Sequence, residues 1–255
     1  MRVDGRWATS ITVAAVSNPA LANAVTAVTS LILTPLLEVL LLVAVSASVG
    51  SPELRDTAYA GILLAFGLTV LTGAVEQVTR DRRLGVVQEV VGYGILNPTY
   101  WGGKLAVPVV LGIVPALAGA GVVFWLDDAH DVDALVRVLL LVPVAAVAGG
   151  LVGLTAAVAS LALSDPYVIA NSAHSVLLIT AGVVLPLGLY PGWLAWIAHA
   201  MPFTAAIEAV RADGSVVPLV LRELGVSLAW FGAGVVVGRR VLAALRSGRR
   251  TEEVW

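Results

Sequence analysis

Long runs of apolar residues, separated by short polar stretches, dominate the chain. Six runs approach or exceed the roughly 20 residues that an α-helix needs to cross the hydrocarbon core of a bilayer. They lie at residues 25–49, 58–79, 105–126, 135–163, 168–189 and 216–241. The last run is the least regular, because Arg222 and Glu223 fall inside its outer turns. The runs are too long for the strands of a membrane β-barrel and lack period-2 alternation, so they predict six membrane-spanning helices.

The first 24 residues have a different character. They carry Arg2, Asp4, Arg6 and Trp7 before a weakly polar stretch. The charge would also suit a cleavable signal peptide, but the apolar run that follows is too long for the hydrophobic region of such a peptide. We therefore expect residues 1–24 to form an interfacial helix that lies along the membrane.

Composition supports the same class. Hydrophobic residues make up 59% of the 255-residue chain and charged residues only 13%, whereas a soluble domain has about 25% charged residues. Too little charge is present to cover a water-facing surface, and too much apolar sequence for a disordered chain. The absence of cysteine excludes disulfides and thiolate sites. The prediction is an all-α integral membrane protein forming a single transmembrane domain over residues 1–255.

The basic residues predict the orientation. If both termini are cytoplasmic, the inner segments, including a tail at 239–255, hold eleven basic residues: Arg2, Arg6, Arg80, Arg82, Arg83, Lys104, Arg239, Arg240, Arg246, Arg249 and Arg250. The outer segments then hold the other four: Arg55, Arg137, Arg211 and Arg222. This asymmetry is a strong positive-inside signal. With one lysine against fourteen arginines, the composition favours a GC-rich bacterial genome, so we expect a bacterial plasma membrane.

Two longer connections carry the functional signals. The cytoplasmic segment 80–104 begins as a short amphipathic helix, is broken by glycines and by Asn97–Pro98, and ends at Lys104, which we expect to snorkel to the headgroup level. The external segment 190–215 has Trp193 and Trp196 at helical spacing before a break at Met201–Pro202. It predicts a helix-break-helix hairpin that dips into the outer leaflet. An interfacial belt of aromatic residues remains the alternative.

These two segments resemble the coupling segment and the C-terminal signature of type-two ATP-binding-cassette (ABC) exporter permeases. The residues that match the coupling segment are Asp81, Arg82, Arg83, Gly85, Val86, Glu89, Pro98, Gly103 and Lys104. Those that match the signature are Pro202, Phe203, Thr204, Glu208, Ala209 and Arg211. The family's Leu-Glu pair is replaced by Val87–Gln88–Glu89, which shifts the glutamate by one position. Six spans and cytoplasmic termini also agree with that family.

The resemblance implies a permease that pairs with a second copy or a homologue in membrane lipid and docks on a dimer of cytoplasmic ABC ATPases. It places a coupling helix at residues 82–93. The coupling residues that follow are Arg82, Arg83, Gly85, Val86, Gln88, Glu89, Pro98 and Lys104. It also places the hairpin 193–211 at the external gate. The gate residues that follow are Trp193, Trp196, Pro202, Phe203, Glu208 and Arg211.

The chain itself lacks a phosphate-binding loop. Gly103 and Lys104 match two positions of that motif, but Pro98 stands where the first glycine is needed and Leu105 where a Ser or Thr is needed. We therefore expect no cofactor and no catalytic residue in this chain, with ATP and Mg²⁺ bound by the partner ATPase. No nucleic-acid partner is expected, and the histidines lack the paired spacing of a metal site.

Three polar residues inside the spans are candidates for the translocation path or the subunit interface. Glu38 lies halfway along the first span, Glu76 near the inner end of the second and His174 in the fifth. An intramembrane carboxylate costs a few kcal/mol, so it normally faces a cavity or a partner. The alternative is structural, with each side chain hydrogen-bonded to a neighbouring helix.

The sequence thus favours an exporter of an amphiphilic or hydrophobic substrate, such as a drug or a lipid-linked or peptide-like molecule. Two alternatives stay open. An intramembrane enzyme would use Glu38, His174 and the aspartates, although no signature motif supports it. A membrane scaffold or immunity subunit would bind an ATPase without transporting, and its coupling segment would look the same.

Overall fold

The computed structural model describes residues 3–16, 18, 21–48, 54–86, 98–212 and 214–246, and in these residues it is built from helices without strands. The elements in chain order are α1 (Val3–Val16), α2 (Ala24–Val28), the π-helical η2 (Thr29–Leu33), α3 (Thr34–Ser48), α4 (Leu54–Arg83), α6 (Pro98–Leu126), α7 (Val132–Ser160), α8 (Val168–Thr180), the 3-10 turn η3 (Leu187–Leu189), α9 (Gly192–His199), α10 (Thr204–Val210) and α11 (Val217–Arg246). The all-α prediction is confirmed.

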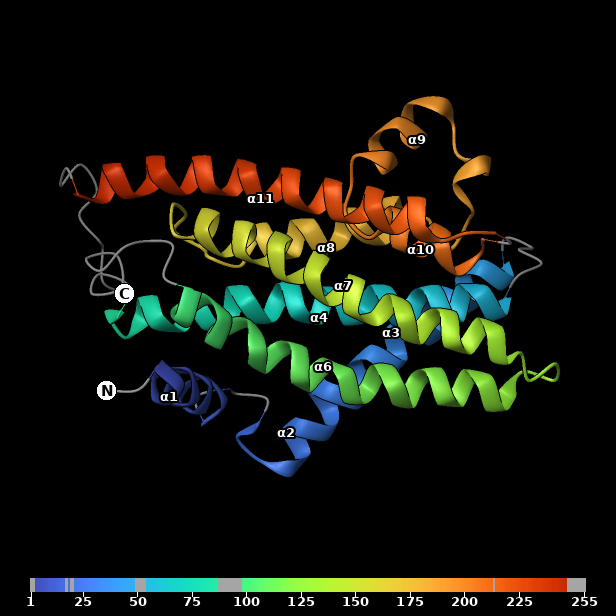
Figure 1. Ribbon diagram of the computed structural model, residues 1–255, viewed down its shortest axis with the longest axis horizontal. Helices are drawn as coiled ribbons and strands as arrows, with labels where there is room; N and C mark the ends of the chain where they lie inside the picture. Colours follow the sequence, from blue (N-terminus) through green and yellow to red (C-terminus); the bar gives the residue numbers. More distant parts are fainter. Residues whose placement is uncertain are drawn as a thin grey trace.

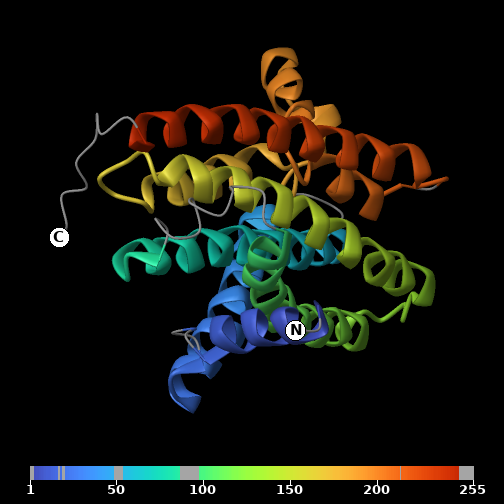
Figure 2. The same ribbon diagram turned by 60° about the vertical axis from the view of Figure 1, so that its left-hand side comes forward.

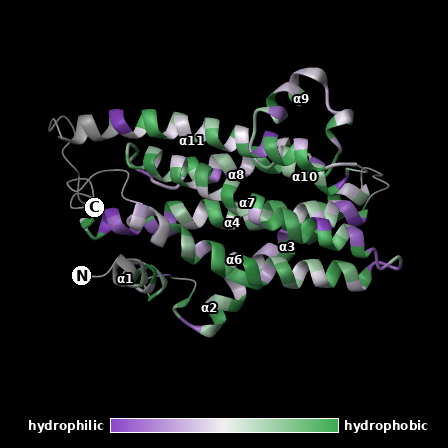
Figure 3. Ribbon diagram, viewed as in Figure 1, coloured by the Kyte–Doolittle hydropathy of each residue, from purple (hydrophilic) through white to green (hydrophobic). Residues whose placement is uncertain are grey.

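Helix α4 is the centre of a bundle whose long members α4, α6, α7 and α11 run along the length of the molecule (Figure 1). In its most apolar stretch, 78% of α4 is buried inside the protein, against 11% for the α2–η2–α3 helix and 17% for α6. Apolar residues cover the middle of the bundle and hydrophilic ones gather toward its ends (Figure 3). The outer helices thus expose apolar faces, as expected where lipid rather than water is the surrounding solvent.

The two ends of the bundle differ in charge. One end, called the basic end below, carries α1, the last turn of α4 and the start of α6 (Figure 1). Its basic residues include Arg80, Arg82, Arg83 and Lys104. The opposite end, called the hairpin end, carries the α6–α7 loop and the α9–α10 hairpin. Its α6–α7 loop holds Asp127, Asp128 and Asp131.

Five of the six predicted spans are confirmed. Within the described residues, five helices are long and apolar enough to cross a membrane, or six if the bent α9–α10 pair counts as one span. The fifth predicted span, 168–189, is not a continuous helix, so this prediction is wrong. Helix α8 has 13 residues, which extend only about 20 Å at 1.5 Å per residue. The chain breaks beyond it at Gly182, which has a positive φ of 79°.

The predicted helix-break-helix form of the hairpin is confirmed. Helices α9 and α10 are bent by 102° relative to each other. The bend follows Met201–Pro202 and is centred on Phe203, whose φ of 70° is in the left-handed region. Because a non-glycine residue seldom adopts this conformation, the surrounding structure must hold it in place.

Helix α1 lies crosswise at the basic end. Figure 1 looks nearly along its axis while the long helices run across the view, and Figure 2 shows it from the side. The Ser10 hydroxyl donates to the Thr99 carbonyl of α6 at 3.3 Å, and the Gln77 amide donates to the Ala14 carbonyl at 3.3 Å. This crosswise packing suits the interfacial helix expected for residues 1–24.

Close helix packing depends on small residues. A Cβ added at Gly149 would lie 2.6 Å from the Gly67 carbonyl oxygen of α4, and one at Gly153 would lie 3.0 Å from the Ala74 Cβ. In α11, a Cβ at Gly234 would lie 2.5 Å from the Thr155 hydroxyl oxygen of α7. These glycines therefore bring α4, α7 and α11 of one chain together.

Candidate functional site

A buried cluster of three polar side chains joins α4 to α6 at the basic end. The Lys104 ammonium donates to Oδ1 of Asp81 at 2.8 Å, and the Tyr100 hydroxyl donates to Oδ2 at 2.6 Å. Asp81 and Lys104 are each only 6% exposed. The expectation that Lys104 snorkels to the headgroup level is wrong, because its charge is balanced inside the protein by Asp81. The pair fixes the inner end of α4 against the start of α6.

The other predicted coupling residues lie around this cluster. Arg82 donates to the Leu163 carbonyl in the α7–α8 loop at 2.7 Å, which ties the end of α4 to a second connection. Arg83 and Val86 are exposed, and Gly85 between them has a φ of 72°. Glycine adopts this left-handed conformation without strain, which explains why α4 ends here.

Of the remaining members of the coupling set, the structure describes only Pro98. Pro98 is the first residue of α6, where its missing N–H leaves no helical hydrogen bond unmade. Gln88 and Glu89, with most of the predicted coupling helix at 82–93, lie outside the described residues. The end of α4 and the start of α6 are therefore the parts of this segment that the structure positions.

Glu38 and His174 face each other in the middle of the bundle. His174 Nε2 of α8 lies 3.8 Å from Glu38 Oε1 of α3, and their side chains are 27% and 29% exposed. Glu76, the third residue of this set, is exposed on α4. Among the described residues, no hydrogen bond or ion pair joins it to Glu38 or His174. The structure thus brings together two of the three candidates for the translocation path.

The bend of the hairpin is held by a carboxylate that sequence reasoning treated only as an irregularity. Glu223 of α11 is fully buried, and its Oε1 accepts from the Phe203 backbone N–H at 2.7 Å. Its Oε2 accepts from the Ala206 N–H at 3.3 Å. The Ser227 hydroxyl, one turn further along α11, donates to Oε1 at 3.2 Å.

The Phe203 ring packs directly on α4. A Cβ added at Gly67 would lie 2.2 Å from the Phe203 Cε1 atom, and the ring itself is 1% exposed. A glycine at position 67 therefore allows the hairpin to seat its bend against the central helix. Pro202 is buried next to it.

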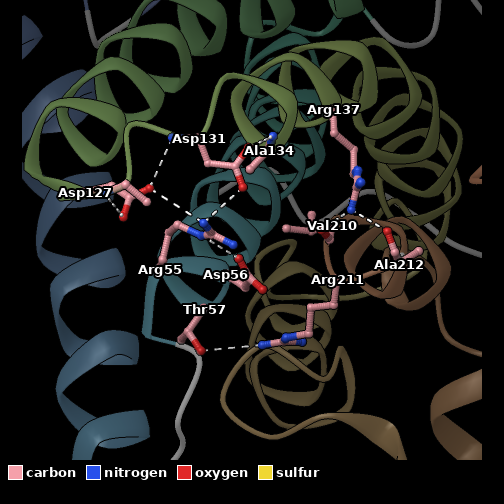
Figure 4. Close-up of polar contacts among 11 residues, drawn as sticks. Arg55, Asp56, Thr57, Asp127, Asp131, Ala134, Arg137, Val210, Arg211 and Ala212 are labelled. Carbon is pink, nitrogen blue, oxygen red and sulfur yellow. Dashed lines mark hydrogen bonds and ion pairs between the residues drawn. The ribbon is translucent and has the colours of Figure 1, made fainter. Parts of the chain in front are cut away.

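Arg211 ties the far side of the hairpin to the chain beyond α8. Its guanidinium donates to the carbonyls of Gly182 at 2.6 Å and Val183 at 2.5 Å. It also lies 3.5 Å from the Thr57 hydroxyl of α4, a contact that Figure 4 shows. Glu208 pairs instead with Arg222 of α11. Each of these two gate residues therefore has its own partner on a different element.

The other two arginines of the hairpin end are also engaged. Arg137 of α7 donates to the carbonyls of Val210 and Ala212 at the end of α10 (Figure 4). Arg55 of α4 lies 3.1 Å from an Asp131 carboxylate oxygen. Arg55 thus joins α4 to the α6–α7 loop, and Arg137 and Arg222 join α7 and α11 to α10.

Asp131 has two roles in this network. Its carboxylate accepts the Ala134 backbone N–H at 3.0 Å and so caps the N-terminus of α7. That hydrogen bond, helped by the positive charge of Arg55, lowers the pKa of Asp131 below its ordinary value. The carboxylate therefore stays charged for Arg55 over a wider pH range.

Helix α9 projects from the bundle (Figure 1), and its two tryptophans are exposed. Trp193 is 68% and Trp196 83% exposed, which suits both a gate dipping into the outer leaflet and an interfacial aromatic belt. The base of the hairpin is anchored, because Tyr190 donates to the Ile179 carbonyl at 2.7 Å. Burial raises the pKa of the Tyr190 phenol.

Sequence reasoning left three positioning residues out of its candidate sites. These are Gly67, Arg137 and Glu223. A signal was available for Glu223, because a carboxylate inside an apolar run needs a partner. Within the described ranges, no group of three or more His, Asp and Glu side chains could hold a metal ion.

Comparison with protein families agrees with these features. A family model described as "ABC-2 type transporter" matches residues 13–213, which run from the end of α1 past the end of α10. The match therefore includes the inner ends of α4 and α6, the Glu38–His174 pair and the hairpin. No curated protein matches the chain.

Proposed function

Because the chain belongs to the ABC-2 type transporter family, whose membrane components are the transmembrane subunits of ABC transporters, we propose that it exports an amphiphilic or hydrophobic substrate outward across a bacterial plasma membrane. Both termini and the basic end would then face the cytoplasm. ATP and Mg²⁺ would be bound by a separate cytoplasmic ATPase dimer, and a second permease copy or homologue would complete the transporter.

The observation that carries the proposal is the Asp81–Lys104 pair. Because this pair joins the inner ends of α4 and α6, the two ends would move together. The exposed turn after α4, with Arg83, Leu84 and Val86, is available to an ATPase next to this pair. A push on that turn would reach α6 through the 2.8 Å ion pair and the α7–α8 loop through Arg82. Separating a buried ion pair leaves uncompensated charge, so the two helix ends would move together.

Helix α4 would carry this displacement to the hairpin end. It is the most buried long helix, and Gly67 on it contacts the Phe203 ring at the bend of the hairpin. Near its other end, Arg55 contacts the acidic residues of the α6–α7 loop. A rigid helix with fixed contacts at both ends can couple a displacement of the exposed turn after α4 to a displacement of the α9–α10 hairpin.

The Glu38–His174 pair would belong to the translocation path or to the interface with the second permease. Both side chains are about a quarter exposed in the apolar middle of the bundle. Lipid is a poor environment for such groups, so a water-filled path or a partner subunit is the favourable surrounding. This supports a role for the pair in passing a substrate.

The decisive experiment is a tagged purification from the native host in mild detergent, followed by mass spectrometry of what remains bound. A stoichiometric ABC ATPase is expected. Arg83→Glu and Val86→Asp on the exposed turn should release it, whereas Arg240→Glu, an equally exposed change on α11 at the same end, should not. A permease that purifies without an ATPase would contradict the proposal. An ATPase that binds without export would identify a scaffold instead.

A further inference from the structure

An apolar groove runs along the outside of the bundle between α3, α4 and α6. Its cavity volume is about 670 Å³. Leu36 and Leu40 of α3 form one wall, Ala118 and Val122 of α6 the other, and Phe66 of α4 lies on the floor. This volume is within the range of about 300–1,000 Å³ that is typical of small-molecule sites.

The groove stays open because its two walls meet α4 differently. Helix α6 is seated closely on α4, since a Cβ added at Gly112 would lie 2.8 Å from the Phe66 ring. Helix α3 instead crosses these helices obliquely (Figure 1). Its Leu36 and Leu40 are 42% and 54% exposed, so nothing in the described part of the chain covers this wall.

The mouth of the groove at the hairpin end is acidic. Arg55, Asp127 and Asp128 line it. The Arg55 guanidinium already lies 3.0–3.6 Å from three carboxylates, those of Asp56, Asp127 and Asp131. Of these carboxylates only Asp127 lines the mouth; Asp128 lines it as well, so one positive and two negative charges give the lining a net charge of −1 at neutral pH. Asp56 and Asp131 add two further negative charges beside Arg55.

We propose that this groove binds an amphiphile with a positively charged headgroup. The apolar tail would lie between α3 and α6, and the headgroup would lie at the carboxylates of Asp127 and Asp128. An anionic headgroup is repelled at this mouth and a neutral one gains no electrostatic attraction. The inference goes beyond the proposed function, because it names the chemistry of a ligand and depends on binding by this chain alone.

The test uses the full chain in nanodiscs of zwitterionic lipid, without an ATPase. Three probes share one alkyl tail and differ in headgroup: dodecyltrimethylammonium, dodecyl sulfate and a neutral dodecyl ether. Binding is measured by competition against a fluorescent alkylammonium, with empty nanodiscs as the blank. We expect the ammonium probe to bind at least about tenfold more tightly than the other two, and to weaken as salt is raised.

Two variants separate the tail site from the headgroup site. Ala118→Phe fills the groove and should remove ammonium binding, whereas Leu117→Phe, the neighbouring exposed position that does not line it, should not. Asp128→Asn removes one mouth charge on an exposed loop and should weaken binding several-fold. Asp165→Asn, an exposed acid at the basic end, should leave binding unchanged.

Equal binding of the three headgroups would overturn the inference. So would ammonium binding that persists unchanged in both Ala118→Phe and Asp128→Asn. These outcomes are independent of the proposed function, since the absence of an ATPase partner in the native host would leave the binding result as it stands.

Discussion

Glu223 of α11 accepts the backbone N–H of Phe203 at 2.7 Å, so the last span holds the bend of the external hairpin. The same carboxylate accepts the Ala206 N–H. These two donors lie at the start of α10, where no helical carbonyl can reach them. A fully buried glutamate inside an apolar helix is thereby explained as a cap on a different helix.

Replacing Glu223 with alanine should loosen the hairpin. The change leaves the N–H groups of Phe203 and Ala206 buried without an acceptor, and each such group costs about 1–3 kcal/mol. We expect a lower thermal unfolding midpoint in detergent and faster proteolysis around the bend. Ser227→Ala is the control, because it removes only one hydrogen bond to Glu223. Equal effects of the two changes would contradict the cap.

Gly67 should be intolerant of a side chain. Gly67→Ala places a Cβ within 2.2 Å of the Phe203 ring, and overpacking of this kind costs about 1–3 kcal/mol. Gly121→Ala on α6 is the matched control, because nothing lies within 4 Å of its added Cβ. There the better helix propensity of alanine should leave stability unchanged or raise it. The measurement is the thermal midpoint of each variant.

A second substitution tests whether the Phe203 ring is the cause. Phe203→Leu combined with Gly67→Ala should recover part of the lost stability, because the smaller side chain makes room for the methyl group. A double variant no more stable than Gly67→Ala alone would point to another source of strain.

The spans could largely be predicted because bilayer thickness imposes a length that an apolar run either meets or misses. The bend of the hairpin was also predictable, since Pro202 cannot continue a helix. The break at Gly182 was not, because the apolar run continues past it. The buried carbonyl of Gly182, which has no helical partner, accepts instead from Arg211, 29 residues away in the chain. Non-helical backbone is tolerated at membrane depth only with such a partner, and that partner depends on tertiary packing.

The candidate site was likewise predictable only in part. Glu38 and His174 could each be singled out, because a polar group inside an apolar run is unusual. Their pairing could not, since it depends on how α3 packs beside α8. Lys104 was read as a snorkelling residue from its position alone. Its buried partner, Asp81, is 23 residues earlier in the chain and on another helix.

Breaking the Asp81–Lys104 pair from one side should be strongly destabilising. Asp81→Asn or Lys104→Met leaves one charge buried without compensation, which costs about 3–5 kcal/mol. The double variant Asp81→Asn with Lys104→Met should be less destabilised than either single change, because neither charge remains. Arg83→Gln, an exposed change two residues from Asp81, should shift stability by less than about 0.5 kcal/mol. Additive losses in this double-mutant cycle would show that the two side chains are not coupled.

The hairpin end should lose stability in acid through Asp131. Because its folded-state pKa is below the ordinary value of 3.8, its contribution is present above that value and is lost as pH falls through the lowered pKa. The thermal midpoint of the wild type should therefore drop more steeply below about pH 4 than that of Asp131→Asn. Asp133→Asn, in the first turn of α7, serves as the control. Parallel curves for wild type and Asp131→Asn would contradict this role.

Glu38 and His174 should act together in transport. Each of Glu38→Gln and His174→Gln should lower the transport rate in proteoliposomes with the partner ATPase by at least about tenfold, which corresponds to about 1.4 kcal/mol in the barrier. Because both side chains are partly exposed, the thermal midpoint should change little. Glu76→Gln, which lies apart from the pair on α4, should have a smaller effect on transport. The double variant should transport no worse than the poorer single variant, since a pair that works as a unit is lost with either member. If the fold-losses in transport rate of the two single variants instead multiply in the double variant, the two residues act at separate steps of transport.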